Sequence, residues 1–343
     1  MFHRVGIAGV ALTVALLGCG KEAAETNAPA PPPPAKAPTT SQAASPAPAV
    51  TMASLDAVTK ADKRYKIVLI VKTRNNPFFK PMIDAFEQTA KELGVEGEVQ
   101  APPQEMDKEK QFALVQTEVG KKVDALCIAP ADSKGIVPAL KAAQDAGVLV
   151  VNLDNRVDAE TARAQNLQLG GYVGADNEAG GRLAGEAMVA ALGGQGKVAI
   201  LEGIRGADNA EARKRGFTEA VNGKLEIVAS ETAEWDTEKA YQKTQNILAA
   251  HPDIVGLFCA NDKMAVGAMK AISEAGKKGK ITVVGYDNIP DVKPALASGE
   301  MAATIEQHPD LMGRYGLKMA VGILNGSVPK GGEILVTLDT VKR

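Results

Sequence analysis

The chain has 343 residues, 45% of them hydrophobic, and a formal net charge of −2. This length is sufficient for two globular domains, and the charge lacks the basic excess that nucleic-acid binding requires. We therefore expect no nucleic-acid partner.

The amino terminus is similar to a bacterial lipoprotein signal. Arg4 precedes an apolar stretch of about a dozen residues, and small residues then lead to Cys19. Because the stretch is shorter than the roughly 20 residues that span a bilayer, a signal is favoured over a transmembrane anchor. The similarity implies a signal peptide over residues 1–18, a lipid on Cys19, and a protein anchored to a bacterial membrane and facing the periplasm or the exterior.

The next segment is rich in proline and alanine. Residues 20–63 contain eight of the 19 prolines and almost no large apolar side chains. Such a segment cannot bury enough surface to offset the entropy of ordering it. We predict a disordered tether over residues 19–64, partly stiffened by polyproline conformation.

From Lys66 onward, short apolar runs alternate with longer amphipathic ones. The predicted strands cover residues 66–71, 123–128, 148–153, 197–201, 225–230, 254–259 and 281–285. The predicted helices cover residues 80–93, 108–121, 133–146, 178–192, 210–221, 237–250 and 263–275. Continuous apolar strands indicate a mainly parallel sheet with helices on both faces.

The pattern runs twice, over residues 66–175 and 176–300. The sequence therefore predicts an α/β fold with two similar lobes, each a doubly wound sheet. The cleft between the lobes is then the expected binding site.

The loop after the first predicted strand has side chains that suit a sugar. It runs from Lys72 through Asn76 to the adjacent aromatics Phe78 and Phe79. Ligands of open α/β sheets lie at the carboxyl ends of strands, where this loop falls. The asparagine amide both donates and accepts, and aromatic faces cover the C–H side of a sugar ring. The alternative is a simple turn with Asn at a helix cap and Phe in the core.

Polar and charged side chains recur after the other strands. They include Asp154, Asn155, Arg156, Arg213, Trp235, Asn261 and Asp287. Each could singly be a solvated loop residue or a cap, but together they mark one pole of the fold. Their nearly balanced charge argues against a phosphate or dicarboxylate ligand and favours a neutral, polyhydroxylated one.

These residues resemble the motifs of periplasmic sugar-binding proteins of the ribose and D-allose type. The resemblance covers residues 66–343 and rests on residues 72–79, 151–154, 211–213, 233–236, 259–265, 285–287 and 302–307. It implies two Rossmann-like lobes joined by three hinge strands, the type I periplasmic binding protein fold. The lobes would comprise residues 65–175 with 308–335, and residues 176–307 with 336–343.

The resemblance also implies a role and a set of contacts. The lobes would close on a monosaccharide and deliver it to an ATP-driven (ABC) importer. The implied sugar contacts are Lys72, Asn76, Phe78, Phe79, Asp154, Arg213, Trp235, Asn261, Asp287 and Gln307, and we add Asn155 and Arg156.

Three positions bear on which sugar is bound. Lys72 stands where ribose binders carry a small hydroxyl residue, and Asn155 where they carry arginine, with Arg156 one place later. Both look more like the allose branch, although Phe79 replaces a tryptophan that is usual there. We expect a hexose such as allose or allulose ahead of ribose, with a cyclitol such as myo-inositol as the alternative.

The signatures of an enzyme are missing from the sequence. The run from Gly193 to Lys197 lacks P-loop spacing, the first strand is not followed by a dinucleotide-binding motif, and no serine nucleophile elbow occurs. None of the three histidines has metal-ligand spacing. We expect no catalytic residues, no metal and no cofactor. A transcription regulator would need a helix-turn-helix module where this chain has an export signal.

The remaining expectations concern partners. The protein is expected to act as a monomer whose partner is a membrane permease. A chemoreceptor or sensor kinase would read the same closed surface, so this alternative stays open. Cys127 and Cys259 each lie in an apolar strand and are expected to be free thiols, with a disulfide between them as the alternative.

Overall fold

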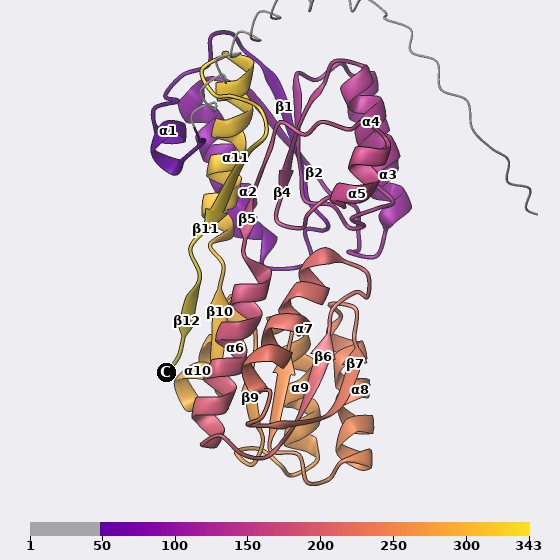
Figure 1. The fold of residues 1–343 in the computed structure, drawn as a ribbon, viewed down its shortest axis with the longest axis vertical. Helices are drawn as coiled ribbons and strands as arrows, with labels where there is room; N and C mark the ends of the chain where they lie inside the picture. Colours follow the sequence, from indigo (N-terminus) through magenta and orange to yellow (C-terminus); the bar gives the residue numbers. More distant parts are fainter. Residues whose placement is uncertain (1–48) are drawn as a thin grey trace, which may run out of the picture. The chain divides into compact units, whose positions relative to one another are not determined.

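The computed structural model describes residues 49–343, which belong to one compact unit that begins at Ala47. Its framework is a pair of six-stranded sheets covered by helices (Figure 1). The predicted signal peptide, Cys19 and the tether up to residue 48 lie outside the described residues.

The first sheet is parallel throughout, with the strand order β11-β5-β4-β3-β1-β2. Its strands are β1 (Lys66–Ile70), β2 (Glu96–Gln100), β3 (Ala125–Ile128), β4 (Leu149–Leu153), β5 (Gly171–Ala175) and β11 (Gly332–Val336). One face packs against α2 (Phe79–Leu93) and α11 (Pro309–Leu324), and the other against α3 (Lys108–Gly120), α4 (Val137–Asp145) and α5 (Ala159–Ala164). Because both faces are covered, β1, β3 and β4 read as continuous apolar runs.

The second sheet has the order β12-β10-β9-β8-β6-β7, and only β12 is antiparallel to its neighbour among the described strands. Its strands are β6 (Lys197–Glu202), β7 (Glu226–Thr232), β8 (Gly256–Cys259), β9 (Thr282–Val284), β10 (Met301–Glu306) and β12 (Asp339–Val341). Around it lie α6 (Asn177–Leu192), α7 (Asp208–Val221), α8 (Thr237–Ala250), α9 (Asp262–Glu274), η1 (Pro290–Val292) and α10 (Lys293–Ser298). Helix α6 packs against α7, and α8 against α9.

We call the first sheet with its helices the first lobe, and the second sheet with its helices the second lobe. Within residues 49–343, the chain passes between the lobes three times, from β5 to α6, from β10 to α11 and from β11 to β12. Because β11 pairs with β5 and β12 with β10, these connections leave from one edge of each sheet. The arrangement confirms the predicted fold class.

The folded part begins earlier than predicted. A short helix, α1 (Met52–Asp56), starts after Thr51, whose side chain accepts from the backbone N–H of Ser54. Leu55 is fully buried, and Asp56 Oδ1 lies 3.3 Å from Lys318 Nζ on α11. The prediction of a disordered tether is therefore wrong between α1 and residue 64, because this segment buries apolar side chains against the first lobe.

Several strands are not predicted from the sequence. Strand β2 is a half-exposed edge strand whose glutamates hide its β character. Strand β5 contains glycines, and a Cβ on Gly171 would lie 2.6 Å from the Gly332 carbonyl oxygen of the neighbouring strand, so close backbone packing excludes a larger residue there. The helix predicted from Ser133 begins only at Val137.

The two described cysteines are free and fully buried in different sheets, Cys127 on β3 and Cys259 on β8. The disulfide alternative is therefore wrong. Burial raises the pKa of the Cys127 thiol to about 12, so this cysteine acts as a small core side chain.

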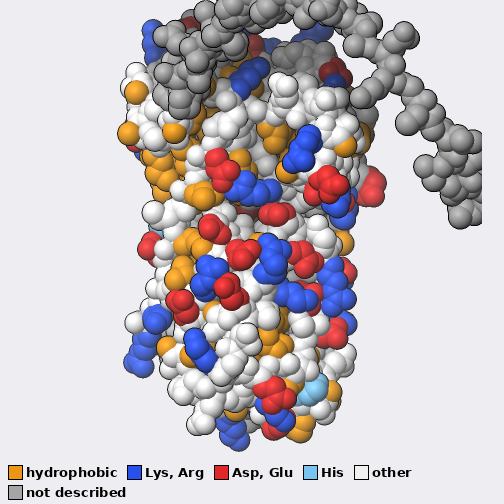
Figure 2. Space-filling model, viewed as in Figure 1, with side chains coloured by type: hydrophobic (Ala, Val, Ile, Leu, Met, Phe, Trp, Pro, Cys, Tyr) orange, Lys and Arg blue, Asp and Glu red, His pale blue; other side chains and the backbone are white. Residues whose placement is uncertain are grey.

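The surface shows no strong bias of charge on the face drawn in Figure 2, where acidic and basic side chains are interspersed. None of the helices over residues 49–343 is long and apolar enough to cross a membrane.

Candidate functional site

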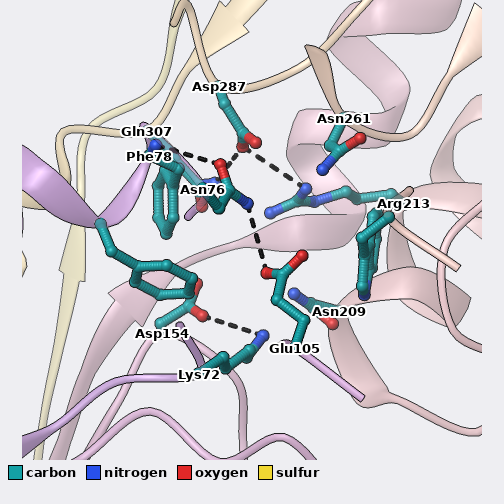
Figure 3. Close-up of a pocket in the computed structure, with 12 residues that line it drawn as sticks. Lys72, Asn76, Phe78, Glu105, Asp154, Asn209, Arg213, Asn261, Asp287 and Gln307 are labelled. Carbon is teal, nitrogen blue, oxygen red and sulfur yellow. Dashed lines mark hydrogen bonds and ion pairs between the residues drawn. The ribbon is translucent and has the colours of Figure 1, made fainter. Parts of the chain in front are cut away.

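A cavity lies where the strand ends of the two lobes meet. Loops after β1, β2 and β4 reach it from the first lobe, and segments after β6 to β10 reach it from the second. It encloses about 240 Å³ of space not filled by protein atoms, part of which is open to solvent. It is lined by Lys72, Asn76, Phe78, Phe79, Glu105, Asp154, Asn209, Arg213, Trp235, Asn261, Asp287 and Gln307 (Figure 3).

The first lobe contributes a buried ion pair. Lys72 Nζ lies 3.1 Å from Asp154 Oδ2, and the two side chains are 5% and 2% exposed. Asp154 has a left-handed backbone with φ of 56°, and its carbonyl oxygen accepts a hydrogen bond from the Tyr172 hydroxyl. Asp154 Oδ2 makes this ionic contact with Lys72 but accepts no hydrogen bond from the described residues. A ligand hydroxyl can accept from the ammonium and donate to the carboxylate at once.

The second lobe contributes another pair, Arg213 and Asp287, with 3.6 Å between Nη1 and Oδ1. Arg213 also donates to the Ala260 carbonyl from Nη1 and to Asn177 Oδ1 from Nε, and Gln307 donates to Asp287 Oδ1 at 2.7 Å. Burial raises the pKa of Asp287 well above its usual value, and Arg213 partly opposes this. The pair is thus held in place from several sides.

The Arg213 guanidinium also lies against aromatic rings. Its carbon is 3.7 Å from the centroid of the Tyr286 ring and 5.6 Å from that of Trp235. Stacking of this kind fixes the orientation of the planar guanidinium. A lysine side chain has no planar group and could not stack in this way.

Aromatic side chains reach the cavity from both lobes. Phe78 and Phe79 pack edge to face in the first lobe, with 5.0 Å between their ring centroids. Trp235 comes from the loop after β7, where Glu234 and Trp235 both have positive φ. A Cβ on Gly203 would lie 2.0 Å from Trp235 Cζ2, so only glycine leaves room for this indole. Such faces suit the C–H side of a sugar ring.

Two amides of the cavity are oriented by local hydrogen bonds. Asn261 caps α9, because its Oδ1 accepts from the N–H of Met264, and this leaves its Nδ2 for another partner. Asn76 Oδ1 accepts from the N–H of Phe78, and Asn76 Nδ2 donates to Glu105 Oε1 at 3.2 Å. Burial raises the pKa of the Glu105 carboxyl, with Lys72 as the main opposing charge.

Some buried cavity atoms have no hydrogen-bond partner among the described residues. They include Asn209 Oδ1 and Gln307 Oε1, both acceptors. Leaving a buried polar atom unpaired costs about 1–3 kcal/mol. A ligand with several O–H donors would remove this cost by donating hydrogen bonds to the two oxygen atoms.

Comparison with known proteins identifies the family to which this architecture belongs. Residues 67–327 match the model of the periplasmic binding protein domain. The chain belongs to the periplasmic binding protein family. This assignment confirms the resemblance found in the sequence and the prediction that the chain is a binding protein and not an enzyme. The family implies an extracytoplasmic location.

Several relatives of this periplasmic binding protein have named ligands. A D-ribose/D-allose-binding protein of Pseudomonas aeruginosa is 37% identical over 268 residues, which cover 77% of this chain and 84% of that protein. The D-allose-binding periplasmic protein of Escherichia coli is 35% identical, covering 83% of this chain and 91% of that protein. A solute-binding protein of Actinobacillus succinogenes, solved with bound D-allose, is 40% identical with a TM-score of 0.77, covering 81% of this chain and 97% of the other.

The fold brings most of the residues singled out in the sequence into one cavity, but it places two elsewhere. Asn155 is fully buried beside the cavity, where Nδ2 donates to the Pro130 carbonyl and Oδ1 accepts from the N–H of Asn209. Arg156 stacks on the Tyr172 ring and pairs with Glu333 at 2.6 Å. Neither residue lines the cavity in this structure, and Asp154 just before them has a left-handed backbone, so their predicted contact with the ligand stays a prediction.

Two cavity residues of this periplasmic binding protein were not singled out from the sequence. Glu105 follows β2, a half-exposed and glutamate-bearing edge strand, so no apolar run in the sequence marks it as a strand-end residue. Asn209 lies in the first turn of α7, four residues before Arg213, where helical spacing could have indicated it.

Proposed function

We propose that the protein binds one monosaccharide in this cavity, a hexose such as D-allose or allulose ahead of D-ribose. The observation that supports this is a small cavity with a buried, opposed charge pair in each lobe and aromatic faces between polar groups. Such pairs suit neutral hydroxyl groups, which donate to one member and accept from the other.

The charge of the lining disfavours an anionic ligand. Lys72 and Arg213 are offset by Asp154 and Asp287, and Glu105 adds a further carboxyl group to the lining. A phosphate or dicarboxylate would need a cationic excess that these residues do not supply. The names of the relatives and the D-allose bound in one solved neighbour support the sugar class.

We further propose that the lobes close around the sugar. Residues of both lobes line the cavity and nearly all of them are buried, so a ligand can enter only when the lobes separate. A ligand that contacts both lobes then shifts the population toward the closed form. The lobe boundaries predicted above remain part of this proposal.

The closed form would be delivered to the permease of an ABC importer. Anchoring through a lipid on Cys19 and a monomeric state complete the proposal. A chemoreceptor or sensor kinase that recognises the closed form is the alternative partner, and it would use the same sugar complex.

The sole tryptophan provides a direct test, because Trp235 lines the cavity. The full chain is titrated with D-allose, D-allulose, D-ribose, other hexoses and pentoses, and myo-inositol, following tryptophan fluorescence and melting temperature. We expect D-allose to change both signals and to saturate with a Kd near or below about 1 µM. A response to myo-inositol alone would favour the cyclitol, and no response to any compound at millimolar concentration would refute sugar binding.

A further inference from the structure

Helix α7 of the second lobe begins without a cap from its own lobe. Its N-cap residue, Ala207, makes no side-chain hydrogen bond to the helix. The first N–H groups of any α-helix have no partner within the helix and need acceptors from elsewhere. Asp208 N–H donates to Ser133 Oγ at 3.3 Å, and Asn209 N–H donates to Asn155 Oδ1 at 3.2 Å. Both acceptors belong to the first lobe.

These acceptors are held firmly before they meet the helix. Ser133 and Asn155 are buried, at 3% and 0% exposure. Asn155 Nδ2 donates to the Pro130 carbonyl at 3.0 Å and to Ser133 Oγ at 3.2 Å. These bonds within the first lobe orient the amide so that its oxygen is directed toward α7.

The capped end of α7 also leads into the cavity. Asn209, whose N–H is bound by Asn155, lines the cavity with its side chain, and Arg213 follows one turn later. A contact between the lobes at this point therefore sets the position of two cavity residues.

We propose that Ser133 and Asn155 are positioning residues that cap α7 across the cleft and stabilise the closed form, with no contact to the ligand. When the lobes separate, α7 moves away and its N–H groups are hydrated. When the lobes close, the same N–H groups are buried and depend on the two acceptors. The inference rests on the proposed function, because it requires the lobes to close around a sugar.

Ser133→Ala gives the cleaner test, because Asn155 keeps its bond to Pro130 in that variant. The cap forms only after closure, so we expect D-allose to dissociate roughly 2- to 10-fold faster, the range for one neutral hydrogen bond, with an unchanged association rate. The melting temperature of the ligand-free protein should fall only slightly, because the open form loses only the bond that Asn155 Nδ2 donates to Ser133 Oγ. Stopped-flow tryptophan fluorescence measures both rates, and Ser327→Ala, at an exposed serine far along the first lobe, is the matched control.

The donor can be removed separately. Asp208 is the first residue of α7, where proline is tolerated, and Ala207 before it has ψ of 129°, which proline accepts. Asp208→Pro deletes the N–H, and Asp208→Ala controls for the lost carboxyl. We expect Asp208→Pro to accelerate dissociation relative to Asp208→Ala. Adding Ser133→Ala should then have less than its separate effect, because both changes remove the hydrogen bond between Asp208 N–H and Ser133 Oγ.

The outcomes separate this inference from the proposed function. If the wild-type protein binds D-allose but Ser133→Ala and Asp208→Pro release it at the control rates, the cap is refuted and sugar binding stands. Fully additive effects of the two changes would also refute it. If the wild-type protein binds no compound of the panel, both proposals fail.

Discussion

The two charge pairs of the cavity differ in how the protein holds them. Lys72 and Asp154 in the first lobe contact each other at 3.1 Å, and Lys72 has no side-chain hydrogen bond to another described residue. Arg213 Nη1 and Asp287 Oδ1 in the second lobe are 3.6 Å apart, but both side chains make further hydrogen bonds, and Arg213 also stacks on Tyr286. The second lobe therefore offers a preorganised surface, whereas the first offers a pair that is more available to a ligand.

The largest effect is expected from Arg213→Ala. The change leaves Asp287 buried without its cation and removes donors from Asn177 and the Ala260 carbonyl. Breaking a buried pair in this way costs about 3–5 kcal/mol, so D-allose affinity should fall at least a hundredfold and the melting temperature should drop. Titration and thermal unfolding measure both, with Arg182→Ala at an exposed ion pair as the control. An unchanged affinity would remove Arg213 from the site.

A smaller effect is expected from Lys72→Met, which keeps the length of the side chain but removes the charge. Lys72→Met also leaves Asp154 buried without its cation, but Lys72 makes no further side-chain hydrogen bonds of the kind that Arg213 makes. Affinity should therefore fall by about 2–3 kcal/mol, with a smaller loss of melting temperature than in Arg213→Ala. Lys108→Met, at the half-buried pair with Asp132, is the matched control. Equal losses of melting temperature in the Lys72 and Arg213 variants would contradict the contrast between the lobes.

Asn261→Ser separates a cap from a ligand contact. Serine still caps α9 by accepting from the N–H of Met264, so the free energy of unfolding should stay within about 0.5 kcal/mol of the wild-type value. The amide Nδ2 that faces the cavity is lost, and affinity should fall by about 1 kcal/mol. Should the affinity remain at the wild-type value, Asn261 is only a cap.

The smallest effect is expected from Glu105→Gln, and it depends on pH. Burial raises the pKa of Glu105 above its usual value of 4.5, so the folded state binds its proton more tightly than the unfolded state. This group therefore contributes stability below its unfolded pKa, and the contribution is lost as the pH rises through the folded pKa. Glutamine keeps the bond from Asn76 and removes the titration, so the decline of melting temperature above pH 4.5 should be shallower. Identical pH profiles would show that Glu105 does not titrate in this way.

Much of the site follows from one rule about parallel sheets. Asp154, Asn261 and Asp287 each follow a predicted apolar strand, and the carboxyl ends of parallel strands converge at one pole, so the sequence already places them together. The rule does not predict Glu105, because the strand before it, β2, is a charged edge strand and not an apolar run. The extent of the tether was overestimated because a single buried leucine in a short helix gives little periodic signal.

The sequence by itself determined the fold class, the family and the polar strand ends, because strand and helix periodicity and local motifs depend on neighbours along the chain. The tertiary structure alone decided which side chains turn inward and which partners they meet. Asn155 and Asp154 are adjacent in sequence, yet one binds a helix of the opposite lobe and the other lines the cavity. That difference arises from a left-handed turn and from a contact between residues more than fifty positions apart, and neither is encoded in local periodicity.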